Sequence, residues 1–159
     1  MTNSDTTLQL RPMVGLGNVF LGSTPETVVA VWSDPLRDIL MPTLSTPARV
    51  RRRMIFNNDL VCDYVNDELK MITFSKTKTR NVTFDGSVLS SLSPIKILRL
   101  FEVLGSRVFK DNDDIVMPEL ALWFYEFEAG EQAEQLISVG LIDFDESEFE
   151  QISFLSRNE

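Results

Sequence analysis

Two short stretches of the chain share one pattern of polar and apolar positions. Thr24-Pro25 opens the first and Ser93-Pro94 opens the second, and in both stretches apolar residues stand three, four, six and seven positions after the proline. This spacing is typical of one face of a helix. A Thr or Ser hydroxyl can accept a hydrogen bond from a backbone N–H at a helix start, and proline fits the first helical position. The pattern predicts helices over residues 25–32 and 94–104, with Gly105 capping the second and a further helical turn over residues 36–41 after the first.

Stretches rich in β-branched and aromatic residues follow each predicted helix. In the first half they are separated by Asn57-Asn58-Asp59 and by Asn66-Asp67-Glu68, a spacing that predicts an antiparallel meander. In the second half a wide acidic turn over residues 129–134 separates two of the stretches. The predicted strands cover residues 51–56, 60–65, 69–74, 107–109, 115–117, 120–127, 135–142 and 149–155.

The two halves therefore have the same order of elements. We predict an α+β fold of two similar helix-plus-antiparallel-sheet units, with the two sheets continuous or side by side. The expected divisions are a flexible N-terminus over residues 1–14, a first repeat over 15–80 and a second over 81–159, forming one compact domain. With 159 residues, 43% of them hydrophobic, the chain is long enough to bury a core. Chance similarity between the halves is the alternative to duplication.

Two segments carry a resemblance to a known group of proteins. The stretch from Val19 to Val28, with the sequence VFLGSTPETV, resembles the opening of the repeat in β-lactamase inhibitory proteins and the outer-membrane assembly lipoprotein superfamily. The stretch from Val82 to Gly86, followed by Leu92-Ser93-Pro94, resembles a second such opening. The resemblance covers most of residues 15–155. It implies short helices packed on an antiparallel sheet whose concave face meets a protein partner. The chain departs from this group because it lacks a lipoprotein signal and the disulfides of secreted inhibitors.

Acidic residues are concentrated in the second half. Residues 1–80 contain ten basic and eight acidic side chains, whereas residues 81–159 contain five basic and sixteen acidic ones, which together make the net charge of −9. No Lys or Arg lies between Asp111 and Ser156. Such a charge distribution repels nucleic acid and attracts basic protein surfaces.

The only basic cluster in the sequence is formed by Arg49 and Arg51 to Arg53. In a strand, Arg51 and Arg53 share one face and Arg52 takes the other. The cluster is therefore expected to meet the acidic half across the sheet, or a second copy of the chain, rather than nucleic acid.

The sequence argues against an enzyme. It contains no histidine, the commonest general base, and Cys62 stands alone among apolar residues, as a small buried hydrophobe does. Gly15-Leu16-Gly17 lacks the third glycine and the lysine of a phosphate-binding loop, so a turn is expected there. Asp111, Asp113 and Asp114 lack the later glutamate of a calcium loop, since position 122 is Leu122. We expect no cofactor and no metal.

These features favour an acidic protein-binding module, which we expect to be a bacterial, cytoplasmic immunity-type inhibitor that covers the active surface of a basic toxin or nuclease. No apolar run is long enough for a membrane span, and Trp123, Phe124, Tyr125 and Phe127 form the pool of aromatic anchors. A structural homo-oligomer, for example a homodimer, and a carboxylate or metal enzyme without histidine remain alternatives. The predicted partner-binding residues are Glu126, Glu128, Glu131, Glu134, Asp143, Asp145, Glu146 and Glu148.

Overall fold

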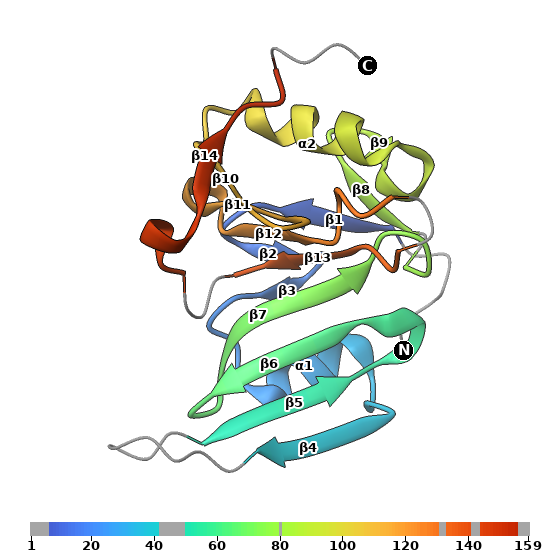
Figure 1. Ribbon diagram of the computed structural model, residues 1–159. Coiled ribbons are helices and arrows are strands. Elements are labelled where there is room, and N and C mark those ends of the chain that lie inside the picture. The colour runs from blue at the N-terminus through green and yellow to red at the C-terminus, as the bar shows by residue number, and fades with distance from the viewer. Residues whose placement is uncertain (1–6, 42–49, 80, 131–132, 141–143, 156–159) are drawn as a thin grey trace.

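The computed structural model describes residues 7–41, 50–79, 81–130, 133–140 and 144–155 (Figure 1). These residues form a mixed α+β structure, mostly β, with two helices and two sheets. The helices are α1 (Pro25–Trp32) and α2 (Pro94–Glu102). The five-stranded sheet has the order β3 (Val19–Phe20), β2 (Gly15–Leu16), β1 (Leu8–Arg11), β8 (Val82–Phe84) and β9 (Ser87–Val88). The nine-stranded sheet has the order β14 (Glu150–Ile152), β10 (Val108–Asp111), β11 (Asp114–Met117), β12 (Leu122–Tyr125), β13 (Leu136–Val139), β7 (Glu68–Ser75), β6 (Val61–Val65), β5 (Arg51–Ile55) and β4 (Arg37–Met41).

Both helices begin where the sequence predicts. The Thr24 hydroxyl accepts a hydrogen bond from the backbone N–H of Thr27 at 3.3 Å, and the Ser93 hydroxyl accepts one from Lys96 at 3.4 Å. A proline occupies the first turn of each helix, where its missing N–H costs no hydrogen bond. The predicted helix starts and N-terminal caps are therefore confirmed. The predicted end of the second helix is wrong, because α2 ends at Glu102 with Val103 as its C-cap, before Gly105.

Replacing Thr24 or Ser93 with alanine should lower the free energy of unfolding by about 1 kcal/mol each, because one N–H at the helix start loses its acceptor. Urea unfolding of the two variants measures this loss. The swaps Thr24→Ser and Ser93→Thr keep a hydroxyl and serve as controls that should retain nearly full stability. An alanine variant as stable as its hydroxyl control would mean that the caps contribute nothing.

Strands from the two halves of the chain form one continuous sheet. The meander β4 to β7 follows α1, and the meander β10 to β13 follows α2. The last strands of these meanders pair antiparallel along four residues, from Ser75 opposite Leu136 to Ile72 opposite Val139. The junction between β7 and β13 therefore sits at the centre of the molecule.

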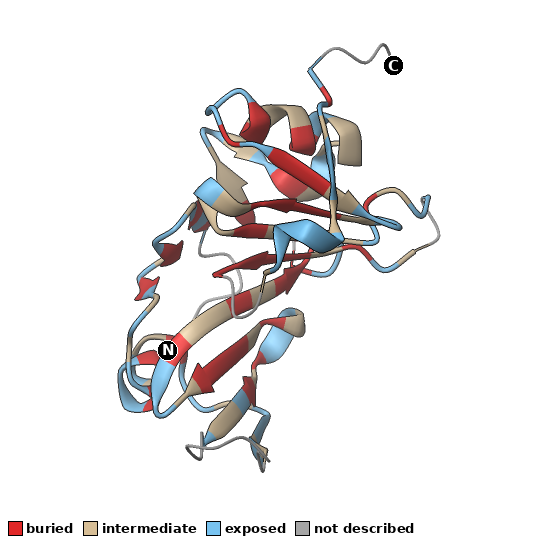
Figure 2. Ribbon diagram, turned by 60° about the vertical axis from the view of Figure 1, so that its left-hand side comes forward, coloured by how far each residue is buried: buried red, intermediate tan, exposed pale blue. Residues whose placement is uncertain are grey.

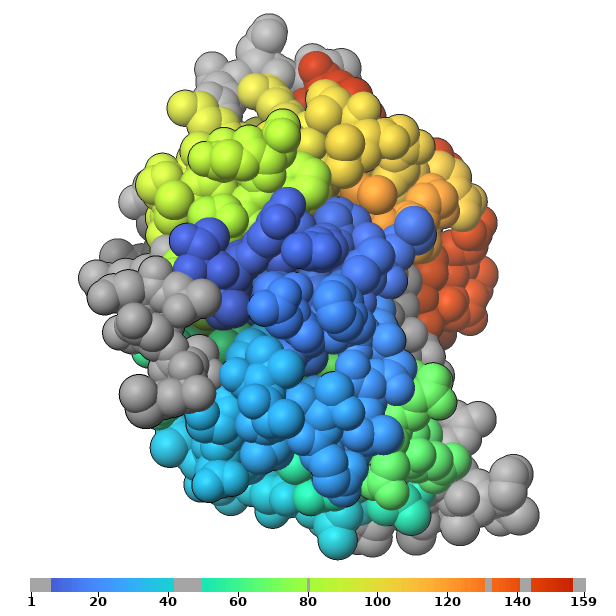
Figure 3. Space-filling view, turned by 180° about the vertical axis from the view of Figure 1, so that it is seen from behind, coloured from blue at the N-terminus to red at the C-terminus, as the bar shows by residue number. Residues whose placement is uncertain are grey.

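One face of the nine-stranded sheet is covered. The helices and the five-stranded sheet pack on it, and buried residues gather where these layers meet (Figure 2). Seen from behind, the N-terminal strands and α1 lie over this side (Figure 3). Trp32 of α1 contacts Phe56 at 5.6 Å between ring centres, and Phe101 of α2 contacts Phe84 at 4.5 Å and Phe124 at 5.8 Å. Trp32 and Phe101 are both buried, as their matching positions in the two helical patterns predict.

The predicted helical turn over residues 36–41 is wrong, because this segment is strand β4. Helix α1 ends at Trp32. Its C-cap, Ser33, has a positive φ of 69° and donates its backbone N–H to the carbonyl of Val29. The chain then turns at Pro35, and β4 pairs with β5 along all five of its residues. Pairing with a strand that lies later in the sequence therefore outweighed the local apolar spacing.

Part of the N-terminal segment that the sequence predicts to be flexible forms strand β1. Leu8 and Leu10 are buried, and β1 pairs antiparallel with β2 and parallel with β8. The alternation of Leu8 and Leu10 with polar residues is typical of a strand, but β8, with which β1 pairs, lies far along the chain. Residues 1–6 lie outside the described part.

Neither described helix is long enough to cross a membrane, since α1 has eight residues and α2 has nine.

Candidate functional site: the open face of the nine-stranded sheet

The second face of the nine-stranded sheet, opposite the helices, is here called the open face. Because side chains alternate along a strand, the register of strand pairing determines which side chains project from the open face. Arg53 lies opposite Asp63, which lies opposite Met71, so these three side chains share the open face. Across the junction, Thr73 lies opposite Ser138, which lies opposite Trp123.

The arginine cluster divides between the two faces as predicted, with Arg51 and Arg53 on the open face and Arg52 on the other. The expected pairing with the acidic half does not occur, because Arg52 pairs with Asp38 at 2.6 Å and Arg53 with Asp63 at 2.7 Å. The reason is distance within the sheet. β5 lies between β4 and β6, and two strands, β6 and β7, separate it from β13, the nearest strand of the second half in this sheet. Arg49 lies outside the described residues.

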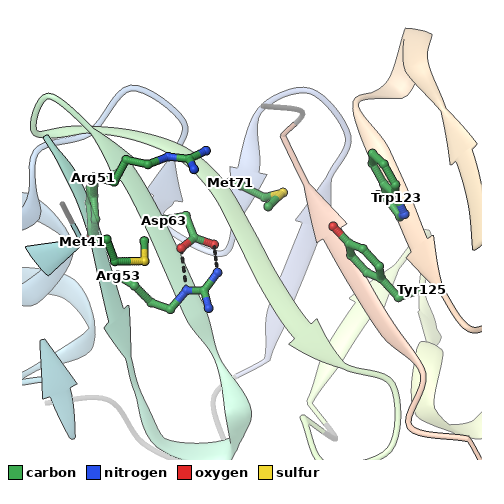
Figure 4. A pocket seen from close by; sticks show the side chains of 8 residues that line it. Met41, Arg51, Arg53, Asp63, Met71, Trp123 and Tyr125 are labelled. Atoms are coloured by element: carbon green, nitrogen blue, oxygen red, sulfur yellow. Dashed lines mark hydrogen bonds and ion pairs between the residues drawn. The ribbon is translucent and has the colours of Figure 1, made fainter. Parts of the chain in front are cut away.

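A hollow of about 300 Å³ lies on the open face (Figure 4). Met41, Arg51 and Arg53 line it on one side, and Trp123 and Tyr125 from β12 line it on the other. Met71 projects from β7 between these two sides (Figure 4). The described residues that line it are Met41, Arg51, Arg53, Asp63, Tyr64, Met71, Trp123 and Tyr125.

The two arginines of the hollow have different surroundings. Arg53 donates to Asp63 through Nε at 2.7 Å and through Nη2 at 3.4 Å, and this hydrogen-bonded pair raises the pKa of the Arg53 guanidinium. Asp63 is only 5% exposed, so the arginine neutralises a carboxylate that would otherwise be buried without a partner. Arg51 has no carboxylate partner among the described residues.

The aromatic side of the hollow comes from alternate positions of one strand. Trp123 and Tyr125 stack with ring centres 5.4 Å apart and planes 14° apart, and both are half-buried. Burial raises the pKa of the Tyr125 hydroxyl. Of the predicted anchor pool, Phe124 and Phe127 lie in the core instead.

Residues 144–149, here called the strap, pack beside the hollow over β10 and β12. The ring centre of Phe144 lies 5.6 Å from that of Phe109 and 5.0 Å from that of Phe149. The ring centres of Phe149 and Trp123 are 5.8 Å apart. The Asp145 carboxylate accepts hydrogen bonds from the hydroxyl of Ser147 at 2.7 Å and from its N–H at 3.1 Å, and these bonds lower the pKa of Asp145. The strap is thus fixed by aromatic contacts beneath it and by its own hydrogen bonds.

Comparisons with known proteins identify no relative. No protein-family model, no curated protein and no solved structure matches the chain. The proposals for its function therefore rest on the geometry of the open face.

The predicted partner-binding carboxylates fall into two groups. Glu126, Glu128 and Glu134 lie in the connection between β12 and β13, whereas Asp145, Glu146 and Glu148 lie on the strap. Glu131 and Asp143 lie outside the described residues.

Three of these carboxylates have cationic partners. The distance between the cationic nitrogen and the carboxylate oxygen is 3.8 Å for Lys110 and Glu128, 3.5 Å for Lys78 and Glu134, and 3.1 Å for Arg107 and Glu146. Glu126 and Glu148 are exposed and have no cation partner within the described ranges. These two carboxylates are therefore the freest to meet a partner.

Other candidate sites from the sequence have structural roles. Cys62 is fully buried, and burial raises the pKa of its thiol, which confirms the prediction of a small buried hydrophobe. Gly17 has a φ of 60° in the turn between β2 and β3, as the turn interpretation predicts. Asp111 and Asp114 face each other at the turn between β10 and β11. No group of three or more potential metal ligands occurs within the described part of the chain.

Sequence reasoning did not find the hollow. Strand alternation predicts that Arg51 and Arg53 share one face, and the sequence indicates Trp123 and Tyr125 only as members of the pool of aromatic anchors. Their meeting depends on the pairing of β7 with β13, which no local pattern indicates.

Proposed function

We propose that this chain is an acidic protein-binding module, an immunity-type inhibitor that covers the active surface of a basic toxin or nuclease in the bacterial cytoplasm. The observation that supports this best is the strap, which holds exposed carboxylates in a fixed arrangement beside an open sheet face. No catalytic activity of its own is part of the proposal.

The strap reduces the cost of binding a basic surface. Ordering a loop at an interface costs conformational entropy, and a loop that is already fixed avoids this cost. The ring contacts of Phe144 and Phe149 and the hydrogen bonds of Asp145 order the strap in the free protein. Fixed negative charges also speed the approach of a basic partner, because the encounter is steered by electrostatic attraction.

We also propose that the fold consists of two similar units, each a hairpin, a helix and a four-stranded meander. The order β2, β3, α1, β4 to β7 in the first half parallels the order β8, β9, α2, β10 to β13 in the second. Both helices start with a hydroxyl cap followed by proline. This arrangement is consistent with the resemblance to the β-lactamase inhibitory proteins, in which a sheet face meets the partner.

Co-expression with the products of adjacent genes provides the first test. A cognate toxin should stop growth when it is produced alone, and it should form a complex with this chain that restores growth. If no neighbouring product is toxic or binds, the immunity proposal fails.

Charge reversal then locates the binding surface. The double variant Glu126→Lys/Glu148→Lys should slow association with that toxin about tenfold at low salt and flatten its salt dependence, because the two uncompensated carboxylates steer the encounter. Stopped-flow or surface-binding kinetics at several salt concentrations measure both effects. Neither side chain has a partner in the described structure, so the fold should remain intact.

The matched control is Asp34→Lys/Asp85→Lys, which makes the same change of net charge on exposed residues away from the strap. Equal slowing by both double variants would mean that only net charge matters, and the proposed surface would be wrong. If Glu126→Lys/Glu148→Lys instead changes the mass of the free protein, the face joins copies of this chain and a homo-oligomeric scaffold is the better account.

A further inference from the structure

The hollow on the open face has the opposite charge character to the protein as a whole. The chain carries a net charge of −9, yet the charged groups that line the hollow among the described residues are two guanidiniums and one carboxylate. That carboxylate, Asp63, is already bonded to Arg53. Within the described part of the chain, the lining of the hollow therefore has one uncompensated positive charge.

Arg51 supplies this charge. The other arginines of the cluster that the structure describes both have carboxylate partners, Arg52 with Asp38 and Arg53 with Asp63. Arg51 has none among the described residues, although it is only half-exposed. A guanidinium held at the edge of a hollow presents donors in a planar fork that matches a carboxylate.

The remainder of the hollow suits an apolar ring. Met41 and Met71 provide polarisable thioethers that adapt to irregular shapes and contact aromatic edges favourably. Tyr125 and Trp123 form a flat wall opposite the arginines (Figure 4). A volume of about 300 Å³ lies at the lower end of the range for small-ligand pockets.

We propose that the hollow binds a carboxylate attached to an aromatic ring, with Arg51 pairing with the carboxylate and the ring lying among Met71, Tyr125 and Trp123. The ligand is either a free aromatic acid or the C-terminal residue of a chain that ends in an aromatic side chain. Both present the same chemistry to the hollow. This site does not depend on a basic protein partner, because it uses neither the strap carboxylates nor those between β12 and β13.

The two tryptophans of the chain make the test selective. Trp123 lines the hollow, whereas Trp32 is buried in α1 against Phe56 on the covered side of the sheet. In a spectrum of the ¹⁵N-labelled protein, phenylacetate at millimolar concentrations should shift the Trp123 indole signal and leave that of Trp32 in place. The neutral phenylacetamide should shift the Trp123 signal much less, and the cationic phenethylammonium should leave it unshifted. Equal shifts with all three compounds, or no shift with phenylacetate, would overturn the proposal.

Variants of Arg51 test the ion pair. Arg51→Ala should weaken phenylacetate binding at least tenfold, and Arg51→Lys should retain part of it, because lysine keeps the charge but loses the fork. Arg37→Ala is the matched control: it removes the same charge from an exposed residue at the edge of the sheet, outside the hollow. Binding that resists Arg51→Ala, or that falls equally in Arg37→Ala, would contradict a specific pairing at Arg51.

A pair of peptides separates the two sources of ligand. A short peptide ending in phenylalanine with a free carboxylate is compared with the same peptide as its C-terminal amide. Tighter binding of the free acid than of phenylacetate, again lost in Arg51→Ala, assigns the site to a protein C-terminus. Weaker binding than phenylacetate assigns it to a free aromatic acid. If neither phenylacetate nor the free-acid peptide binds, the hollow is not a carboxylate site.

Discussion

Replacing Gly140 with alanine is expected to lower the free energy of unfolding by about 3–5 kcal/mol, because two separate costs combine at this position. The φ of Gly140 is +101°, a conformation that residues with a Cβ rarely adopt. An added Cβ would also overlap the backbone carbonyl of Lys70 in β7. The Gly140 N–H meanwhile bonds to Ala121 at 2.7 Å, so the chain cannot move away from β7 without losing this bond.

Gly105→Ala separates the two costs. Gly105 has the same φ of +101°, but no described atom lies within 4 Å of the position that its Cβ would take. The free energy of unfolding of this control should fall only by the cost of the strained backbone conformation, about 1–2 kcal/mol. Urea unfolding of both variants measures the difference, which reports how closely β7 and the end of β13 pack. If the two glycines cost the same, the junction between the halves is looser than the structure indicates.

Phe101→Ala is expected to destabilise the protein by about 3–5 kcal/mol, because it opens a cavity where three elements meet. Phe101 is completely buried and contacts Phe84 of β8 and Phe124 of β12. It therefore joins α2 and the five-stranded sheet to the nine-stranded sheet. The shift of the urea midpoint, with the slope of the transition unchanged, measures the loss.

Phe20→Ala is the matched control for this truncation. It removes the same ring from a residue that is 42% exposed, and it should cost about 1 kcal/mol or less. A similar loss in both variants would show that Phe101 does not occupy the joint between the layers. A lower slope for Phe101→Ala alone would show that the halves unfold separately.

Local features of the sequence predict the helices well. A hydroxyl, a proline and apolar residues at helical spacing suffice, because the capping hydrogen bond and the first turn involve residues only three positions apart, as at Thr24 and Ser93. The strands β5, β6 and β7 were equally predictable, since short turns such as Asn66-Asp67 join neighbours in the sheet. The split of Arg51 and Arg53 from Arg52 followed from strand alternation alone.

Contacts between distant segments were not predictable. β1 is a strand because β8, more than sixty residues later, pairs with it, and residues 37–41 form a strand because β5 offers a partner. The local pattern of either segment fits more than one structure, and the free energy of sheet pairing decides between them.

The sequence by itself determined the α+β class, the starts of both helices, the meander of the first half and the acidic character of the second half, because each depends on neighbouring residues or on composition. The tertiary structure decided where the charges and rings lie. The pairing of β7 with β13 brings Arg51 and Met71 near Trp123 and Tyr125, and together these residues line the hollow. The contacts of Phe144 and Phe149 hold the strap beside it. These arrangements join residues that are far apart in the chain, so only packing and sheet register specify them.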